Sequence, residues 1–240
     1  MLYLIGLGLD YNSISKKSLE IIGKCKKIYL ENYTVEFPYP IKKLEEVTKK
    51  KIFPADREFI ESLNIVDEAK KTDVALLIYG SPLTATTHIS LIQESMKKKV
   101  KYKIIYNASI LDAVAETGLQ LYKFGKISSI PKWSESFKPK SFIENLKQNL
   151  SIDAHSLILI DIGLKFKDAL DELTESADYY KLKLNKIIVC SNLGTDKSEI
   201  IYGKIDDLTD KNIKAPFCLI VPGKLHFVEE EVLEYHSKKI

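Results

Sequence analysis

The sequence predicts an α/β protein built from two domains. Strand-like and helix-like runs alternate through the first half of the 240 residues, which is typical of a helix-covered parallel sheet. In the second half NLGTDK (192–197) separates two strand-like runs as a hairpin-like turn would, which indicates a mixed sheet. The rhythm changes near Ala113 to Gly118. We therefore expect a Rossmann-like domain over 1–112, with a mostly parallel sheet, and a mixed-sheet α/β domain over 113–240.

The elements of the first half follow from apolar spacing and helix caps. Ser15 is a plausible N-cap for a helix to Cys25, and Asp56 for a helix to about Lys71. Further helices are expected from Ile41, from Thr84 to Lys98 and from Ser109 to about Glu116. Strands are expected at residues 2–5, 27–31, 51–53, 74–79 and 101–106.

The second half is less regular. Helices are expected from Pro139, over residues 166–183 and over 227–237. Strands are expected at 127–131, 156–161, 186–191, 199–205 and 217–221. The sequence contains no internal repeat and no low-complexity tract.

Composition narrows the function classes. Hydrophobic residues make up 45% and charged residues 29%, which is ordinary for a soluble globular protein. No apolar run approaches the ~20 residues of a membrane span, and the N-terminus reads as a strand, so we expect a cytoplasmic protein. The net charge is +3 and Arg57 is the only arginine, which disfavours a nucleic-acid surface. The three cysteines and four histidines show no metal-binding spacing.

A glycine-containing turn, IGLGLD (5–10), directly follows the first strand. Two glycines let the backbone turn tightly and approach a ligand. A dinucleotide site is one interpretation, because Glu31 ends the second strand where a ribose-binding acid would sit. However, Tyr11 occupies the place of the third glycine in G-x-G-x-x-G, so this pattern is incomplete. A plain tight turn is the other interpretation.

Small and hydroxyl residues follow three of the predicted strands. IGLGLD, YGSPL (79–83) and YNASI (106–110) each begin at the end of a strand. In open α/β sheets, ligands bind beyond the carboxyl ends of the strands. We therefore expect the three loops to line one pocket. We also expect residues 84–87 to begin the next helix, with their small side chains leaving room for a ligand.

Four sequence strings together resemble the diphthine synthase family, of the tetrapyrrole-methylase-like class of S-adenosylmethionine methyltransferases. They are GLGL (6–9), GSPLTATTH (80–88), YKFGK (122–126) and IVPGKLHFVE (220–229). The resemblance spans nearly the full chain. It implies two α/β domains with S-adenosylmethionine in the cleft between them, and a homodimer. It also implies methylation of the amino group of a 3-amino-3-carboxypropyl-histidine on translation elongation factor 2, in diphthamide biosynthesis, with S-adenosylhomocysteine as the other product.

The resemblance also implies an archaeal source and a trimethylated amine as the product. Carried over residue by residue, it implies that the cofactor contacts Leu9, Ser81, Thr84, Ser109, Ile110, Ile160, Leu193 and Phe217. Two positions depart from the family pattern. Ser81 replaces the usual aspartate, so this loop keeps a hydrogen-bonding group but loses a charge. Phe217 replaces a histidine, so it could stack on adenine but not hydrogen-bond to it.

Neither the residues nor the resemblance identify a catalytic base. Asp112, Glu116, His88, His226 and Asp161 are candidates, and a capping or packing role explains each of them equally well. Lys132, Trp133 and the polar loop 134–139 are candidates for docking a protein substrate. Lys224 and His226 are candidates for contacting substrate or cofactor.

Two other functions stay open at this point. One is a methyltransferase of the same fold that acts on a tetrapyrrole or corrin precursor. The other is a cofactor-sensing protein without turnover, which the loss of charge at Ser81 would favour. No metal is expected in any of these cases.

Overall fold

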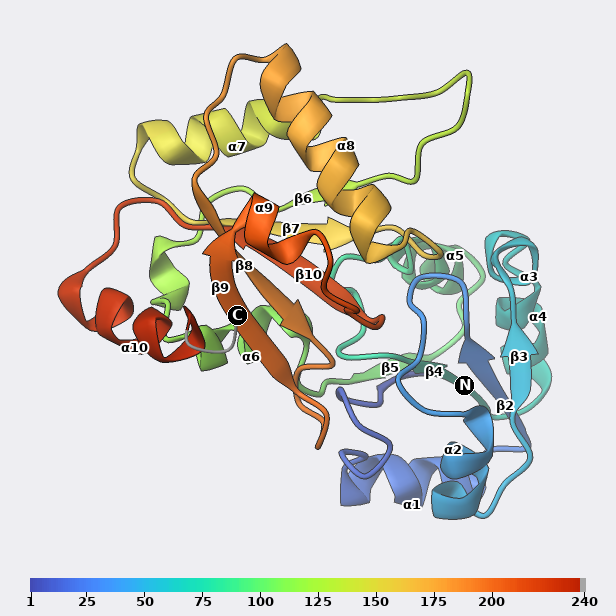
Figure 1. Ribbon diagram of the computed structural model, residues 1–240. Coiled ribbons are helices and arrows are strands. Elements are labelled where there is room, and N and C mark those ends of the chain that lie inside the picture. The colour runs from blue at the N-terminus through green and yellow to red at the C-terminus, as the bar shows by residue number, and fades with distance from the viewer. Residues whose placement is uncertain (238–240) are drawn as a thin grey trace. The chain divides into compact units, whose positions relative to one another are not determined.

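The computed structural model describes residues 1–237, and Figure 1 shows its ribbon. The contacts between residues divide the chain into two compact units, Met1–Leu111 and Asp112–Ile240. Each unit contains one five-stranded sheet with helices packed on it. The protein therefore has the α/β class expected from the sequence, with one parallel and one mixed sheet.

The sheet of the first unit is entirely parallel. Its strand order is β3-β2-β4-β1-β5, and every neighbouring pair runs in the same direction. Parallel neighbours need crossover connections, which the helices supply. The strands are β1 (Leu2–Gly6), β2 (Lys27–Glu31), β3 (Phe53–Ala55), β4 (Val74–Ile78) and β5 (Tyr102–Ile105). The helices are α1 (Lys16–Lys24), α2 (Ile41–Thr48), α3 (Arg57–Glu61), α4 (Asn64–Lys71), α5 (Ile89–Lys97) and α6 (Ile110–Ala113).

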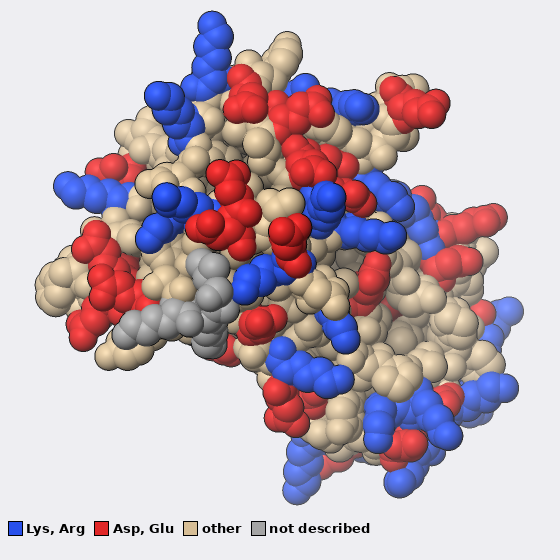
Figure 2. Space-filling view, in the orientation of Figure 1, with Lys and Arg blue, Asp and Glu red and all other residues tan. Residues whose placement is uncertain are grey.

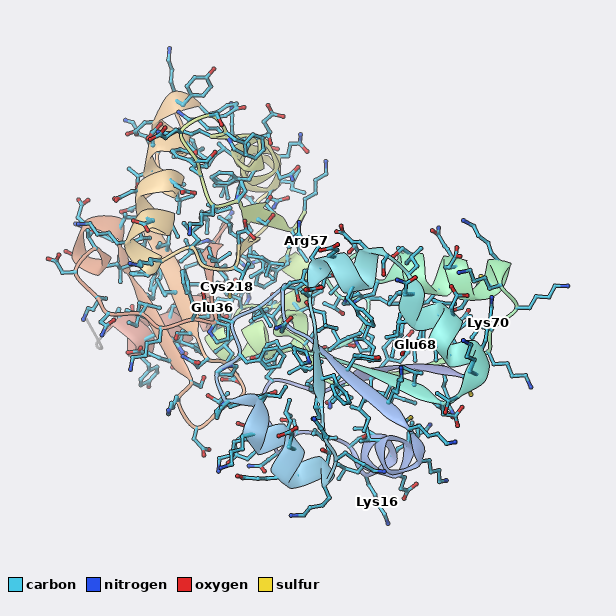
Figure 3. The ribbon with its side chains drawn as sticks, turned by 90° about the vertical axis from the view of Figure 1, so that its right-hand side faces the viewer. Lys16, Glu36, Arg57, Glu68, Lys70 and Cys218 are labelled. Atoms are coloured by element: carbon cyan, nitrogen blue, oxygen red, sulfur yellow. The ribbon has the colours of Figure 1, made fainter. Side chains whose placement is uncertain are left out.

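Alternate residues of these strands face two separate cores. Leu4 and Leu76 pack with α3, α4 and α5 on one face, whereas Ile5 and Leu77 pack with α1 and α2 on the other (Figure 1). Polar contacts add to this packing. Glu68 of α4 accepts a hydrogen bond from the Tyr29 hydroxyl at 2.8 Å, which ties this helix to β2 (Figure 3). Because both faces are covered, only the strand ends are open to a ligand.

The sheet of the second unit is mixed. Its order is β6-β7-β10-β8-β9, in which β6 and β7 are parallel and the other neighbours are antiparallel. The expected hairpin is the pair β8 and β9. The strands are β6 (Ser128–Ile130), β7 (Ser156–Ile160), β8 (Lys186–Ser191), β9 (Glu199–Lys204) and β10 (Phe217–Val221). The helices are α7 (Phe142–Ser151), α8 (Phe166–Tyr179), α9 (Ile205–Leu208), α10 (Phe227–Ser237) and the 3-10 turns η1 (Val114–Thr117) and η2 (Leu121–Lys123).

One face of this second sheet carries the main core of the unit. Phe142 and Leu146 of α7 and Leu170 and Leu173 of α8 pack there against the inner side chains of the strands. The helix α10 packs against β9 (Figure 1). Among residues 1–237, no helix has both the length and the apolar character needed to cross a membrane.

Several expected boundaries are wrong. The helix expected to run from Asp56 to Lys71 is broken at Leu63, whose φ of 60° is left-handed. Asp56 does cap α3, and its carboxylate accepts the Phe59 N–H at 2.8 Å. The strand expected at 51–53 lies at Phe53–Ala55, because it pairs in register with Tyr29 to Glu31.

Two helices of the second unit are shorter than expected, and one was missed. Helix α7 begins at Phe142 rather than at Pro139, because the Pro139 carbonyl accepts a hydrogen bond from the indole of Trp133. Helix α8 ends at Tyr179, since Lys181 takes a left-handed φ of 55°. The short helix α9 has no counterpart in the expected elements.

Candidate functional site

The three loops expected to line a pocket meet at the carboxyl ends of β1, β4 and β5. Beyond β1, the Leu7 N–H donates to the Ile78 carbonyl at 2.9 Å. Gly8 and Gly80 then exchange two backbone hydrogen bonds of 3.0 and 2.9 Å. The first two loops therefore continue the pairing of β1 with β4 past the ends of the strands.

Asn107 joins the third loop to the first. Its side-chain amide donates to the carbonyls of Gly6 and Ser13, at 3.3 and 2.9 Å, and its side-chain oxygen accepts the Ala108 N–H. The sequence analysis did not single out this residue. The available signal was its position directly after a strand, where a side chain with both donors and an acceptor can hold a neighbouring turn.

The glycines permit this close approach. A Cβ atom at Gly6 would lie 2.7 Å from the Gly80 carbonyl oxygen and 2.8 Å from Pro82 Cδ. Gly8 has a φ of +74°, which disfavours any other residue. Gly80 faces Ser109. A Cβ atom at Gly80 would lie 3.6 Å from the Ser109 Cα. The first and second loops therefore pair through their backbones, whereas the side chain of Asn107 ties the third loop to the first.

The structure places all five candidate positions of the first unit on these three loops. Leu9 is buried, and its carbonyl accepts a hydrogen bond from the Tyr79 hydroxyl at 3.2 Å. Ser81 is buried, and its carbonyl accepts the Thr84 N–H at 3.3 Å. Ser109 is buried, its hydroxyl accepts the Leu111 N–H, and Ile110 begins α6 beside it. One edge of the first sheet thus gathers the hydroxyl groups of Ser81, Thr84 and Ser109.

The three candidate positions of the second unit also share one sheet edge. Ile160 is the last residue of β7, Phe217 is the first residue of β10, and Leu193 follows β8. Cys218 pairs with Leu159 on one side, and Phe217 pairs with Ser191 on the other. These antiparallel pairings bring the three residues to neighbouring strand ends. The Phe217 ring packs edge-on against Phe166, with centroids 5.5 Å apart.

The expectation that residues 84–87 begin a helix is wrong. Helix α5 begins at Ile89, and no side chain caps it. Leu83 and Ala85 have left-handed φ values of 67° and 54°, which an α-helix cannot contain. The string GSPLTATTH therefore forms an irregular loop. The Thr86 hydroxyl is buried in this loop and has no hydrogen-bonding partner in the described structure.

His88 lies behind this loop and is a poor candidate for a catalytic base. Its side chain is fully buried against the edge of Tyr33, and within residues 1–237 neither ring nitrogen has a hydrogen-bonding partner. Burial lowers the pKa of His88 to about 4, because the charged imidazolium would lose its hydration. The ring is therefore neutral near pH 7 and takes up a proton with difficulty.

Other candidate bases have local structural roles. The Asp161 carboxylate accepts the backbone N–H groups of Lys132 and Ile162, at 3.2 and 3.0 Å. Glu116 accepts a hydrogen bond from the Ser198 hydroxyl at 3.2 Å. His226 lies in the turn before α10, where its ring accepts the Val228 N–H at 3.4 Å. Asp112 lies on α6. These contacts assign no proton transfer to any of them.

Glu31 does not have the free carboxylate that a dinucleotide site would need. It is fully buried, and its oxygens accept the N–H groups of Tyr33 and Thr34 and the Thr34 hydroxyl, at 2.7 to 3.0 Å. Burial raises its pKa, and these three hydrogen bonds act in the opposite direction. Glu31 therefore holds the turn after β2. No cluster of three metal-ligating side chains occurs within residues 1–237.

The strings YKFGK and PGKLHFVE form a buried polar cluster in the second unit, which we call the Glu229 cluster. Glu229 is fully buried near the start of α10. It accepts hydrogen bonds from the Lys123 ammonium at 2.5 Å, from the N–H groups of Gln120 and His226, and from the ring of His155 at 3.1 Å. The other ring nitrogen of His155 accepts the Gly223 N–H at 3.0 Å, so the proton of the neutral ring lies on Nε2.

The charges in this cluster are well compensated. Burial by itself would raise the pKa of Glu229, but the Lys123 ammonium and the three other donors outweigh it and lower this pKa to about 2. The Lys123 ammonium also donates to the Lys224 carbonyl at 2.8 Å. These motifs therefore hold the second unit together. This structural role was not among the roles predicted from the sequence, where Lys224 and His226 were candidates for contacting substrate or cofactor.

The family model, the curated relatives and the solved structures that this chain resembles all point to the same family. Residues 1–209 match the family model described as tetrapyrrole (corrin/porphyrin) methylases. The chain is 38% identical to the diphthine synthase of Methanocaldococcus jannaschii, with all of both chains covered. It is 42% identical to the diphthine methyl ester synthase of Bos taurus, over 97% of this chain and 94% of that one. A crystal structure of a diphthine synthase matches with a TM-score of 0.90 and 30% identity, over 99% of this chain and 96% of the other.

Proposed function

We propose a function from the premise that this chain belongs to the diphthine synthases of the tetrapyrrole (corrin/porphyrin) methylase family and is therefore a methyltransferase. The methyl donor in the proposal is S-adenosylmethionine. The acceptor is the amino group of the 3-amino-3-carboxypropyl-histidine on translation elongation factor 2, in diphthamide biosynthesis.

The observation that carries the proposal is the meeting of three loops at one edge of the first sheet. Ser81, Thr84 and Ser109 supply hydroxyl groups there, and Gly6, Gly8 and Gly80 keep the backbone free of side chains. Hydroxyl and backbone groups suit the uncharged polar atoms of an adenosine and the polar end of an amino acid. These residues thus fit S-adenosylmethionine. Leu9 and Ile110 are proposed contacts from the same loops, and Ile160, Leu193 and Phe217 are proposed contacts from the second unit.

The chemistry asks little of the side chains. S-adenosylmethionine, when bound, supplies an electrophilic methyl carbon. The amine nitrogen of the acceptor would form a bond to this carbon as the carbon–sulfur bond breaks and S-adenosylhomocysteine leaves. The nitrogen would give up a proton after each of the first two transfers, and a third transfer would leave a quaternary ammonium with no proton to lose. The loops contribute by holding the donor in one orientation, and such orientation can supply ~7–11 kcal/mol of the barrier. The proton goes to water in this proposal, because His88 is buried with a low pKa.

Two numbers of transferred methyl groups are candidates, because the relatives of this chain include both diphthine synthases and diphthine methyl ester synthases. The sequence analysis expects a trimethylated amine. The 42% identity to a diphthine methyl ester synthase favours a second candidate, in which a further methyl group is placed on the carboxylate of the same acceptor. We also propose that the protein is a cytoplasmic homodimer, with domains over 1–112 and 113–240. Its relatives include an archaeon and a mammal, so an archaeal source stays a prediction.

The test is a mass spectrum of elongation factor 2 that carries the unmethylated intermediate, after incubation with this protein and S-adenosylmethionine. We expect a gain of three methyl masses on the modified histidine. A further methyl mass that mild alkali removes would establish the ester candidate. Methylation of a tetrapyrrole or corrin precursor, with elongation factor 2 unchanged, would contradict the proposal. Binding of S-adenosylmethionine without any transfer would favour a sensor.

A further inference from the structure

The loop between β6 and α7, residues 131–141, is longer than a connection requires and is firmly anchored. At its start the backbone N–H groups of Lys132 and Trp133 donate to the carboxylates of Asp161 and Glu172, at 3.2 and 3.1 Å. The Trp133 indole N–H donates to the Pro139 carbonyl at 3.2 Å, which closes the loop on itself. Ser134 and Phe137 exchange two backbone hydrogen bonds at the tip. The loop is therefore a defined surface feature, and it appears in Figure 1 as the yellow-green segment that extends past α7 and α8.

Aromatic and basic side chains share this feature. Two lysines contact the Trp133 ring, because the ammonium groups of Lys138 and Lys140 are each 5.5 Å from its centroid. Lys140 also lies 4.8 Å from the Tyr179 ring at the end of α8 and pairs with Glu175 at 2.9 Å. Phe137 and Tyr179 remain 61% and 69% exposed. We call Phe137 and Tyr179, with the lysines at 132, 138 and 140, the loop surface.

The composition of the loop surface resembles that of a protein interface. Exposed aromatic rings provide large contact areas with little loss of side-chain entropy, and they are enriched in such interfaces. Residues 131–141 contain three lysines and one glutamate, and Glu175 of α8 pairs with Lys140, so the loop surface keeps a small net positive charge. Figure 2 shows blue and red side chains interspersed over the face that it draws. A basic surface around aromatic side chains fits a partner that is acidic around an apolar contact.

We propose that the loop surface docks the protein acceptor through an acidic surface of that acceptor. This inference rests on the proposed function and deepens it, since it assigns recognition of the protein to residues outside the loops that hold the methyl donor. It separates two tasks. The strand-end loops of the first unit orient the methyl group, and the loop surface sets the affinity for the folded acceptor.

The experiment measures steady-state methylation of two acceptors. One is folded elongation factor 2 with the unmethylated intermediate, and the other is a short peptide that carries the same modified histidine. The variants are Phe137→Ser and Lys132→Glu, neither of which removes a side-chain contact that anchors the loop. Matched controls are Ile152→Ser, at another exposed apolar residue of the second unit, and Lys16→Glu, at an exposed lysine of the first.

We expect Phe137→Ser and Lys132→Glu each to raise KM for the folded acceptor about tenfold, which corresponds to about 1.4 kcal/mol. The kcat for that acceptor, the kinetics with the peptide and the affinity for S-adenosylmethionine should not change. Added salt should raise KM of the wild type more than KM of Lys132→Glu, because screening weakens an attraction that the variant has lost.

Three results would overturn the inference in distinguishable ways. An unchanged KM for the folded acceptor in both variants, with active wild type, would show that the loop surface does not dock it. Failure of the wild-type protein to methylate either acceptor would remove the proposed function, and the docking role with it. An equal rise of KM for the peptide and the folded acceptor would place these residues at the methyl-transfer site instead.

Discussion

Gly6 is the residue on which the closeness of the strand-end loops depends most directly. Any Cβ there would press on the Gly80 carbonyl, on Pro82 and on Asn107, 2.7 to 3.1 Å away. Two of these contacts involve backbone or a proline ring, which cannot rotate away. A methyl group at this position must therefore push the loops apart.

We expect Gly6→Ala to lower the free energy of unfolding by about 1–3 kcal/mol, as overpacking does, and to weaken S-adenosylmethionine binding at least tenfold. Urea denaturation and calorimetric titration measure the two effects. Gly23→Ala is the matched control, because Gly23 lies inside α1 with no atom near its missing Cβ. That change should stabilise the protein by about 0.5–1 kcal/mol. Unchanged binding in Gly6→Ala would contradict the role given to these loops.

His88 makes stability depend on pH in a defined window. Its pKa falls from 6.5 to about 4 on folding, so below pH 6.5 the unfolded chain binds a proton that the folded protein refuses. The stabilisation is complete above pH 6.5 and is lost as the pH falls toward 4, by up to ~3 kcal/mol. His155, whose pKa is also lowered by burial, acts in the same direction.

His88→Phe should reduce this loss without abolishing it, because the ring then has no site for the proton. At pH 7 the variant should be at least as stable as the wild type, since a phenyl ring leaves no buried nitrogen without a partner. Urea denaturation at a series of pH values between 7 and 4 measures the slope. His226→Phe, at an exposed histidine, is the control. Equal slopes for wild type and His88→Phe would show that His88 is solvated or paired in solution.

At the scale of elements, the Glu229 cluster connects α10 to η2 and to the turns around His155 and Gly223. Removing the charge leaves the partly buried Lys123 ammonium beside a neutral group, and breaking a buried pair costs up to about 3–5 kcal/mol. We expect Glu229→Gln to lower the free energy of unfolding by that amount. Glu231→Gln, on the exposed side of the same helix, should change it by less than about 0.5 kcal/mol.

The same cluster predicts a second loss of stability in acid. Glu229 contributes to it because its paired carboxylate becomes neutral, whereas His88 contributes because its buried neutral ring becomes charged. The pKa of Glu229 is lowered from 4.5 to about 2, so its stabilisation is complete above pH 4.5 and disappears as the pH falls toward 2. The wild type should lose stability through this range, and Glu229→Gln should lose less. A variant that shows the wild-type slope between pH 4.5 and 2 would contradict the ionised state of this carboxylate.

Comparison of the predicted and observed helices and strands shows which boundaries the sequence predicts correctly. Strands β2, β8 and β10 and helix α10 lie where apolar runs and their flanking residues place them. Three of the failures, the break between α3 and α4, the start of α5 and the end of α8, share a cause. Left-handed backbone occurs there at residues that are not glycine, so the residue type does not predict where the helix breaks. These residues are Leu63, Leu83, Ala85 and Lys181. Tertiary packing imposes these conformations, and sequence patterns register only local preferences.

The candidate site divides in the same way. The glycines and small residues of GLGL and GSPL predicted the strand-end loops, because a tight turn after a strand depends on the residues of the turn itself. Asn107 was missed, since its partners Gly6 and Ser13 lie 101 and 94 residues earlier in the chain. The role of Glu229 was missed for the same reason, as Lys123 and His155 reach it from distant segments. Long-range hydrogen bonds of this kind leave no trace in spacing.

At the scale of the whole molecule, each unit has its own hydrophobic core, so we expect the two to differ in stability. Trp133 is the only tryptophan and lies in the second unit, and its fluorescence therefore reports on that unit. Far-UV circular dichroism reports on both. Urea transitions followed by the two probes should not coincide, and S-adenosylmethionine at 100 times its Kd should stabilise the folded protein by up to ~2.7 kcal/mol. Coincident transitions would show that the units unfold as one.

The paired hydrogen bonds between Gly8 and Gly80, together with the Asn107 amide, have a kinetic consequence. The loops are already fastened to one another, so, under the proposed function, capture of the methyl donor would not have to wait for them to assemble. The rate of association in stopped-flow mixing should then rise in proportion to donor concentration, without reaching a plateau set by a slow rearrangement. Turnover would be limited by what happens after the donor has arrived.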